Sequence, residues 1–279
     1  MQLGSVDGRA VLFSDGRALD VATASGEALP ADPVALLERW DDLVAWALDA
    51  DWSASYAVTA ERLGAPVPTP RQVFAIGLNY APHAAEAGFT PPAQPMVFTK
   101  FPSCIVGPVA EVRLPPGNVD WEIEVVAVVG RGGFRIPRDQ AWDALAGLTV
   151  GQDLSERLAQ LAGTPPQFSL AKSHPGFGPT GPVLVTTDEL PDRDDIAFES
   201  RLGDEVIQHG RTSQLIFPID VLVEHISSTC PLLPGDLIFT GTPGGVGNRR
   251  TPQRFLQDGE VLISRMDGVG EIRQTFVAG

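Results

Sequence analysis

The sequence has little cysteine and no concentrated positive charge. Its 279 residues include two cysteines, Cys104 and Cys230, which form no CxxC motif, so neither a disulfide framework nor a zinc knuckle is indicated and buried thiols are expected. The formal net charge is −15, and lysine and arginine form no cluster. Proteins bind both nucleic acid and anionic membranes through basic patches, so neither is an expected partner. An anionic substrate would need a local positive site.

Long apolar runs are also missing. The N-terminal stretch MQLGSVDGRAVLFSDGRALD lacks a basic start followed by an apolar segment. No later apolar run approaches the roughly 20 residues needed to cross a bilayer. We therefore expect a cytoplasmic protein. Hydrophobic residues make up 43% and charged residues 20% of the chain, which is ordinary for a globular protein with a sizeable core.

Several common catalytic motifs are absent as well. The sequence contains no GxSxG, HExxH or GxxxxGKS/T. The commonest hydrolase, zincin and P-loop nucleotide-binding hypotheses are therefore removed.

The first quarter of the chain is predicted to form a small domain over residues 1–68. In GRAVLFSDGRALDVA, Asp-Gly between two strand-like runs predicts a β-hairpin. DPVALLERWDDLVAWALDADW predicts a helix with Asp32 as its cap and Pro33 at its first position. The proline-rich GAPVPTPRQV places a boundary near residue 68.

Residues 69–279 are predicted to be mostly β. Short apolar runs separated by Gly, Pro, Asp and Asn dominate, and helical patterns are confined chiefly to RDQAWDALAGLTV, SERLAQLAG and PIDVLVEHISS. This arrangement favours an α+β protein built on a largely antiparallel roll or sandwich.

Two carboxylates stand out in DWEIEVVAVVG, residues 120–130. Glu122 and Glu124 share one face of the predicted strand. Buried together they would repel, and a hard divalent cation would neutralise both. For an isolated ExE pair, the solvated face of an edge strand is the commoner situation.

A third acid follows another apolar run. Asp153 in LTVGQDLSERLAQ stands where the run ends and a helix-like segment begins. It could be a helix-associated aspartate, with Ser155 as the competing cap. Three carboxylates without Cys or His nearby would favour Mg²⁺ or Mn²⁺ over zinc.

Further polar groups suit an anionic substrate, although each has an ordinary alternative. Lys172 is a lone base in a Gly/Pro-rich segment, where a solvated lysine is common. Arg157 and Gln160 would lie near Asp153 on one face of a continuing helix, although Arg157 could equally form a surface ion pair. Thr242 lies in the Gly-rich loop of FTGTPGGVG, which could hold a carboxylate or simply turn.

A possible base occurs in GLNYAPHAAEAG. His83 and Glu86 are three residues apart, so on a helix the carboxylate could orient the imidazole. A surface i,i+3 pair would have the same spacing.

Taken in order, these segments resemble the fumarylacetoacetate hydrolase family. The motifs are GLNYAPHAAEAG, DWEIEVVAVVG, GQDLSERLAQ, FSLAKSHPGFGPTGP, LLPGDLIFTGTPGGVG and DGEVLISRMDGVGEI. The resemblance covers about residue 70 to the C-terminus, and the first part is similar to the small N-terminal domain of many bacterial members. Members with these motifs include acylpyruvases, oxaloacetate decarboxylases, isomerases and hydratases of short 2-keto acids.

The resemblance implies a role for each candidate residue and a homodimer. The implied Mg²⁺ or Mn²⁺ ligands are Glu122, Glu124 and Asp153. Lys172 is implied to face the substrate oxyanion, Thr242 the substrate carboxylate, and Arg157 and Gln160 are implied in or near the site. His83 and Glu86 are similar to a water-activating dyad on a lid segment.

Three positions depart from the family pattern. Gln152 stands where Asn usually precedes the aspartate, Trp121 where Tyr is frequent, and His174 where an acid is common. The first two changes keep polarity or bulk, so the metal site should survive. His174 could alter substrate choice or the charge around the site.

The expected function is metal-dependent hydrolysis of a C–C bond in a short 1,3-diketo acid, such as an acylpyruvate or fumarylpyruvate. The metal would act as a Lewis acid, and the His–Glu dyad would activate water. The alternatives are an oxaloacetate-type decarboxylase, an isomerase or hydratase of the same family, and a metal-loaded β protein that binds an acid without turnover.

Overall fold

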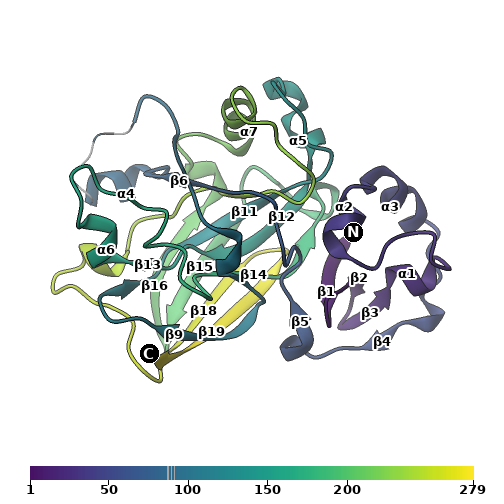
Figure 1. Ribbon diagram of the computed structural model, residues 1–279, viewed down its shortest axis with the longest axis horizontal. Helices are drawn as coiled ribbons and strands as arrows, with labels where there is room; N and C mark the ends of the chain where they lie inside the picture. The colour runs from purple at the N-terminus through teal and green to yellow at the C-terminus, as the bar shows by residue number, and fades with distance from the viewer. Residues whose placement is uncertain (87, 89, 91) are drawn as a thin grey trace.

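Figure 1 shows the computed structural model, which describes residues 1–86, 88, 90 and 92–279. In this part of the chain, twelve strands form one large sheet. Its order is β4-β3-β2-β1-β14-β12-β11-β17-β6-β7, with β5 beside β1 and β8 beside β14. Its strands are β1 (Gln2–Val6), β2 (Arg9–Ser14), β3 (Arg17–Asp20), β4 (Tyr56–Ala57), β5 (Leu63–Gly64), β6 (Val73–Gly77), β7 (Met96–Thr99), β8 (Ile105–Val106), β11 (Ile123–Val129), β12 (Leu145–Gln152), β14 (Gly178–Val185) and β17 (Leu237–Phe239).

A second sheet packs on the first and completes a sandwich. Its order is β16-β15-β18-β19-β9, and its strands β18 and β19 lie against β12 and β14. The strands are β9 (Val109–Leu114), β15 (Ala197–Leu202), β16 (Glu205–Arg211), β18 (Val261–Met266) and β19 (Gly270–Ala278), and a separate ladder joins β10 (Val119–Asp120) to β13 (Ser155–Glu156). Val150, Val183, Met266 and Ile272 belong to one buried apolar cluster. The predicted α+β class with a mostly β sandwich is confirmed.

The helices are short and lie outside the sheets. They are α1 (Val21–Ala24), α2 (Pro33–Leu37), α3 (Trp40–Ala47), α4 (Ala81–Glu86), α5 (Ala141–Ala144), α6 (Arg157–Leu161) and α7 (Ile219–Ser227). In the view of Figure 1, α4 and α6 lie at the end of the sandwich away from the N-terminal strands, whereas α5 and α7 lie together above the sheets. None of the described helices is long and apolar enough to cross a membrane.

Two helix predictions require correction. The single helix expected from Asp32 is interrupted: Asp32 caps α2 through a 2.8 Å bond from the Ala35 N–H, but α3 starts only at Trp40. The helical pattern at residues 138–150 gives a 3₁₀ turn at Arg138–Gln140 and an α-helix only over α5. Leu145–Gln152 instead forms β12, whose residues are all buried, and a short, fully buried apolar run has no periodicity that separates strand from helix.

The N-terminal hairpin is confirmed. Asp15 and Gly16 join β2 to β3 with φ of 48° and 73°, the left-handed conformations that a tight hairpin turn requires. β1 pairs antiparallel with β14 through Gln2 and Leu3, so this unit extends the large sheet. The boundary near residue 68 stays a prediction.

Candidate active site

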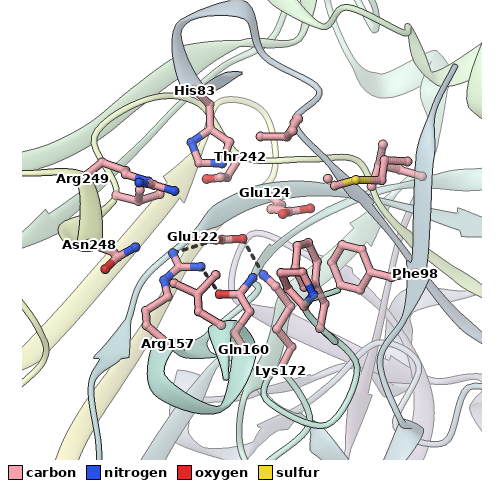
Figure 2. Close-up of a pocket in the computed structure, with 18 of the residues that line it drawn as sticks. His83, Phe98, Glu122, Glu124, Arg157, Gln160, Lys172, Thr242, Asn248 and Arg249 are labelled. Carbon is pink, nitrogen blue, oxygen red and sulfur yellow. Dashed lines mark hydrogen bonds and ion pairs between the residues drawn. The ribbon is translucent and has the colours of Figure 1, made fainter. Parts of the chain in front are cut away.

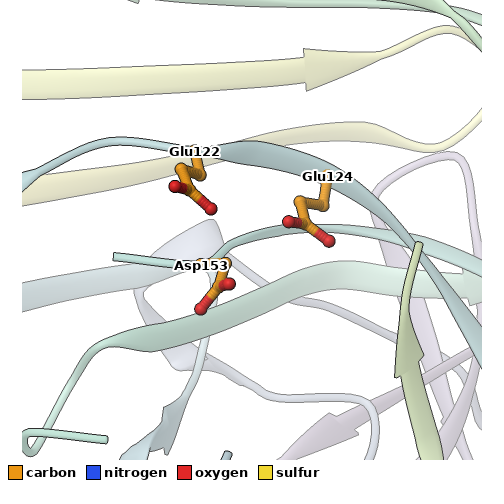
Figure 3. Close-up of side chains that lie close together, drawn as sticks. All are labelled: Glu122, Glu124 and Asp153. Atoms are coloured by element: carbon orange, nitrogen blue, oxygen red, sulfur yellow. The ribbon is translucent and has the colours of Figure 1, made fainter. Parts of the chain in front are cut away.

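Three carboxylates converge at the start of β11. This strand lies between β12 and β17 in the interior of the large sheet, which excludes the edge-strand alternative for Glu122 and Glu124. The Asp153 N–H donates to the Glu122 carbonyl at 2.8 Å and sets Asp153, just after β12, beside the pair. One oxygen of each carboxylate lies within 4.8 Å of those of the other two (Figure 3). The side-by-side geometry anticipated from the sequence is therefore present.

The charges around the carboxylates are unevenly distributed. Glu122, Glu124 and Asp153 are 6%, 1% and 0% exposed. Burial opposes the ionisation of Glu122, but the charges of Lys172 and Arg157 outweigh it and lower its pKa to about 2. For Glu124, burial together with repulsion from Asp153 and Glu122 raises the pKa well above its usual range. Glu124 is thus the carboxylate that most needs another cation.

Lys172 connects two of the carboxylates. Its Nζ lies 2.7 Å from Glu122 Oε2 (Figure 2) and 2.6 Å from Asp153 Oδ2. The ammonium also lies 5.3 Å from the centre of the Phe98 ring. Lys172 is 2% exposed, so the solvated-lysine alternative is wrong.

A second lysine, which the sequence analysis did not single out, donates to the other carboxylate oxygen of Asp153. Lys100 Nζ donates to Asp153 Oδ1 at 2.7 Å and to the carbonyls of Lys172 and Phe177. Burial alone would lower the pKa of Lys100, but the charge of Asp153 outweighs it and the pKa is raised. The one available signal is rarity, because Lys100 and Lys172 are the only lysines among 20 basic residues.

Asp120 is a second missed residue, and it joins α6 to the loop that follows β17. Arg157 Nε donates to Asp120 Oδ2 at 2.8 Å, and an Arg157 Nη2 lies 2.7 Å from Glu122 Oε1. Asp120 also accepts the N–H groups of Gly247 at 2.7 Å and Asn248 at 2.9 Å. Arg157 is therefore a buried cation of the site and not half of a surface ion pair.

The loop after β17 is tied to β11 at two points. The Gly241 N–H donates to Glu124 Oε2 at 2.7 Å, and the Thr242 hydroxyl donates to the Ile123 carbonyl at 2.9 Å. Gln208 Nε2 donates to Thr242 Oγ1 at 2.8 Å. The loop is more than a turn, because its backbone contacts the carboxylate cluster directly.

His83 and Glu86 form the expected pair on α4. His83 Nδ1 lies 2.8 Å from Glu86 Oε1, and Glu86 Oε2 accepts the Gly245 N–H at 3.0 Å. The imidazole side chain is 12% exposed and lines the same cavity as Glu122. A surface pair is thereby excluded, and the dyad is attached to the loop after β17.

The cavity encloses about 440 Å³. Seven of the nine candidate residues line it: His83, Glu122, Glu124, Arg157, Gln160, Lys172 and Thr242. Asp153 and Glu86 lie directly behind, bonded to Lys172 and His83. Figure 2 shows Asn248 and Arg249 on the side opposite Phe98. Sequence reasoning missed both Asn248 and Arg249.

Some reasons given for individual residues are corrected. Arg157 and Gln160 do not share a helix with Asp153, because α6 begins only at Arg157. Their own i,i+3 spacing is real: Arg157 Nη1 donates to Gln160 Oε1 at 2.8 Å. Among the cysteines, Cys104 is buried and Cys230 only partly so, and both are free thiols.

The three departures from the family pattern have distinct environments. Gln152 accepts the Glu122 N–H and donates to Ser264 Oγ, each at 2.8 Å, so it braces β11. Trp121 is fully buried and donates from Nε1 to the Gly245 carbonyl at 3.2 Å. The His174 ring packs at 4.9 Å from that of Phe177 and is outside the cavity lining.

The residues present fit a hard divalent metal ion. The cluster offers three carboxylate oxygens and no nitrogen or sulfur ligand, the donor set that Mg²⁺ and Mn²⁺ prefer. The raised pKa of Glu124 shows an electrostatic deficit that such an ion would relieve.

Comparisons with known proteins agree with this geometry. The model described as fumarylacetoacetate (FAA) hydrolase C-terminal matches residues 72–277. A mitochondrial oxaloacetate tautomerase of Homo sapiens is 40% identical over 210 residues, 75% of this chain and 67% of that protein. A Mycobacterium smegmatis structure provisionally named HpcE is 53% identical with a TM-score of 0.95, and both chains are covered at 100%.

One solved structure carries ligands. Maleylpyruvate hydrolase from Sphingobium sp. SYK-6, in complex with manganese(II) and pyruvate, is 26% identical with a TM-score of 0.82 and 100% coverage of both chains. The length of the family match and the identity of these relatives establish the classification. The chain belongs to the fumarylacetoacetate hydrolase family of enzymes.

Proposed function

We propose that this enzyme is a hydrolase that cleaves the C–C bond between the two ketone groups of a short 1,3-diketo acid, with Mg²⁺ or Mn²⁺ held by Glu122, Glu124 and Asp153. The observation that carries the proposal is the His83–Glu86 pair, which lies in the same cavity as the buried carboxylate cluster. The family relatives named as a hydrolase of maleylpyruvate and as oxaloacetate tautomerases support a 2-keto acid substrate.

The hydrogen bonds of the dyad give His83 the form of a general base. Because a carboxylate only accepts, Glu86 favours the His83 tautomer that carries its proton on Nδ1, and in that tautomer the Nε2 lone pair can take a proton. Because Glu86 also accepts the Gly245 N–H, the imidazole orientation is fixed relative to the loop after β17. His83 would take a proton from the attacking water.

The bond changes in the proposed reaction balance without a further reactant. The water oxygen attacks the distal carbonyl carbon, the bond between C3 and C4 breaks, and its electron pair passes to the pyruvyl half as an enolate. Protonation at C3 then gives pyruvate and a carboxylic acid. A bound divalent ion would supply Lewis-acid stabilisation of the developing negative charge.

The remaining residues hold the 2-keto acid. Lys172 places a positive charge at the carboxylate cluster, where it would stabilise the substrate oxyanion. Gln160 uses Oε1 to accept from Arg157, so its amide N–H groups are the end left to donate to substrate. The Thr242 loop would contact the substrate carboxylate.

Oxaloacetate chemistry is the second candidate, favoured by the 40% identity to an oxaloacetate tautomerase. Decarboxylation would release CO₂ from the same bound 2-keto acid without a water nucleophile, whereas tautomerisation would move one proton between C3 and the enol oxygen. His83 could serve tautomerisation but is not required to activate water in either reaction. The homodimer and the cytoplasmic location also remain proposals.

A three-substrate assay tests the proposal. Acetylpyruvate, fumarylpyruvate and oxaloacetate are each incubated with enzyme and Mg²⁺ or Mn²⁺, and in parallel with EDTA, while pyruvate formation and enol absorbance are followed. Hydrolysis predicts metal-dependent pyruvate from the first two substrates. Turnover of oxaloacetate alone would replace the hydrolase by a decarboxylase if pyruvate forms, and by a tautomerase if only the enol signal changes.

The dyad gives a sharper version of this test. His83→Ala should slow acylpyruvate cleavage by roughly 10² to 10⁴-fold, the range for losing a general base, and slow any oxaloacetate decarboxylation much less. Glu86→Ala should follow the same pattern more mildly. His209→Ala, at an exposed position on β16, is the matched control and should keep the wild-type rate. Wild-type hydrolysis by His83→Ala would eliminate this residue as the base.

A further inference from the structure

The cavity has one apolar and one polar side beyond the carboxylate cluster. The apolar side is formed by β6, β7 and the segment before Lys172, and it includes Ile76, Leu78, Met96, Phe98 and Phe168. In the view of Figure 2, Asn248 and Arg249 of the loop after β17 lie on the opposite side, and they line the same cavity as His83. A substrate that extends from the cluster toward this side therefore approaches a guanidinium group.

Arg249 differs from the other cations of the cavity. Arg157 and Lys172 are already engaged by site carboxylates. Within the described residues, the Arg249 side chain forms no ion pair or hydrogen bond, although its neighbours Arg250 and Arg254 are paired with Glu205 and Glu260. In a chain with a net charge of −15, a cation at a cavity without an anionic partner is available for a ligand.

The backbone that carries Arg249 is held in place. Asp120 accepts the N–H groups of Gly247 and Asn248, and the Arg249 N–H donates to the Val246 carbonyl at 3.2 Å. Because Asp120 also binds Arg157, the loop is fixed relative to the carboxylate cluster. The backbone of Arg249 is thus held at the cavity rim, and its exposed side chain reaches the cavity from there.

We propose that Arg249, assisted by Asn248, binds the distal carboxylate of a dicarboxylic 2-keto acid, so that the enzyme prefers a dicarboxylic over a monocarboxylic substrate. The inference rests on the proposed placement of the 2-keto acid at the metal cluster. The carbon chain lies along the apolar side, while the second carboxylate remains at the partly hydrated rim, where guanidinium can bind it in a bidentate manner. An apolar acyl group would leave Arg249 unpaired.

Two unreactive ligands isolate this interaction. 2-Oxoglutarate and 2-oxopentanoate have the same five-carbon chain and the same 2-keto acid end, and differ in carrying a terminal carboxylate or a methyl group. Their affinities for the Mg²⁺-loaded enzyme are measured by calorimetry. Wild type should prefer 2-oxoglutarate, and Arg249→Gln should reduce that preference by roughly 10-fold, the scale of a charge-assisted hydrogen bond at a partly exposed site. Its affinity for 2-oxopentanoate should stay within about 2-fold.

Controls separate a local contact from general electrostatics. Arg265→Gln removes the same charge from an exposed position on β18 and should leave the ratio of the two affinities unchanged. Arg249→Lys should retain part of the preference because the charge remains. An unchanged ratio in Arg249→Gln, or a wild-type preference for 2-oxopentanoate, would overturn the inference.

Failure of the hydrolase proposal gives a different result. Neither ligand contains a 1,3-diketone, so their binding does not depend on C–C cleavage. A preference for 2-oxoglutarate that depends on Arg249, with no cleavage of fumarylpyruvate or acetylpyruvate, supports this inference and rejects hydrolysis. Cleavage of acetylpyruvate with no dependence on Arg249 in either assay rejects this inference alone.

Discussion

Replacing Lys100 with methionine tests how the two lysines share Asp153. Methionine keeps the apolar stem and removes the ammonium, which is fully buried and donates to Asp153 Oδ1 and two carbonyls. Breaking a buried ion pair costs roughly 3–5 kcal/mol. Asp153 keeps its second partner, Lys172, at 2.6 Å. We therefore expect Lys100→Met to lower the free energy of unfolding of the metal-free protein by the lower end of this range, about 3 kcal/mol.

The effect of metal distinguishes charge compensation from simple packing. A divalent ion at the cluster would compensate the charge that Lys100→Met leaves on Asp153. The loss in the free energy of unfolding caused by Lys100→Met should therefore be smaller with Mn²⁺ by about 1 kcal/mol or more. Opposite charges a few ångströms apart interact by a few kcal/mol even at an effective dielectric constant near 20. If Lys100 only filled space, the loss would be the same with EDTA and with Mn²⁺.

Urea unfolding followed by tryptophan fluorescence provides the assay, because Trp121 is buried beside Glu122. Wild type and Lys100→Met are compared with EDTA and with saturating Mn²⁺. Arg265→Met, at an exposed site, is the control and should change the free energy of unfolding by no more than about 0.5 kcal/mol. A loss below about 1 kcal/mol in EDTA, or an equal loss in both conditions, would refute the reasoning.

Three further predictions concern the site and the pH dependence of stability. Glu122→Ala or Asp153→Ala should abolish metal binding and activity while the fold persists; undiminished Mn²⁺ affinity in calorimetry would rule out that ligand set. Lys172→Ala should lower kcat/KM by roughly 10²-fold or more, as for a lost oxyanion donor, and a change of a few-fold would count against that role. Burial raises the pKa of Asp236 to about 6, so the native state binds this proton more tightly than the unfolded chain and the free energy of unfolding should fall as pH rises from about 4 to 6. Asp236→Asn should remove about 2 kcal/mol of that fall in denaturant titrations, and an identical pH profile in both proteins would contradict the assignment.

Local signals were sufficient for elements whose partners are close in sequence. The hairpin at Asp15 and Gly16 and the α7 helix follow from turn chemistry and helical periodicity, and both are present. Strand alternation also places Glu122 and Glu124 on one side, which only required β11 to be a strand. That strand alone could not distinguish an edge from the interior, because this depends on β12 and β17.

The residues that were missed depend on contacts far apart in the sequence. Lys100 is 53 residues from Asp153, and Asp120 is 128 residues from Asn248. In neither pair are the two residues related by helix or strand periodicity. Local sequence patterns therefore could not predict that the two side chains lie close together. Arg249 was missed for a related reason: what matters there is the lack of a partner, which becomes visible only when its surroundings are folded.

The charges of the cavity connect the metal, the substrate and Arg249. When ionised, the four carboxylates of the site carry one more negative charge than its three cations carry positive charge. The carboxylates are Asp120, Glu122, Glu124 and Asp153, and the cations are Lys100, Arg157 and Lys172. A divalent ion reverses that excess to a single positive charge, which one substrate carboxylate can neutralise. Repulsion and burial would penalise a second carboxylate placed at the same cluster. Arg249, across the cavity from the apolar side, offers that second carboxylate a separate cation, so the metal cluster and Arg249 together favour a ligand with negative charge at both ends.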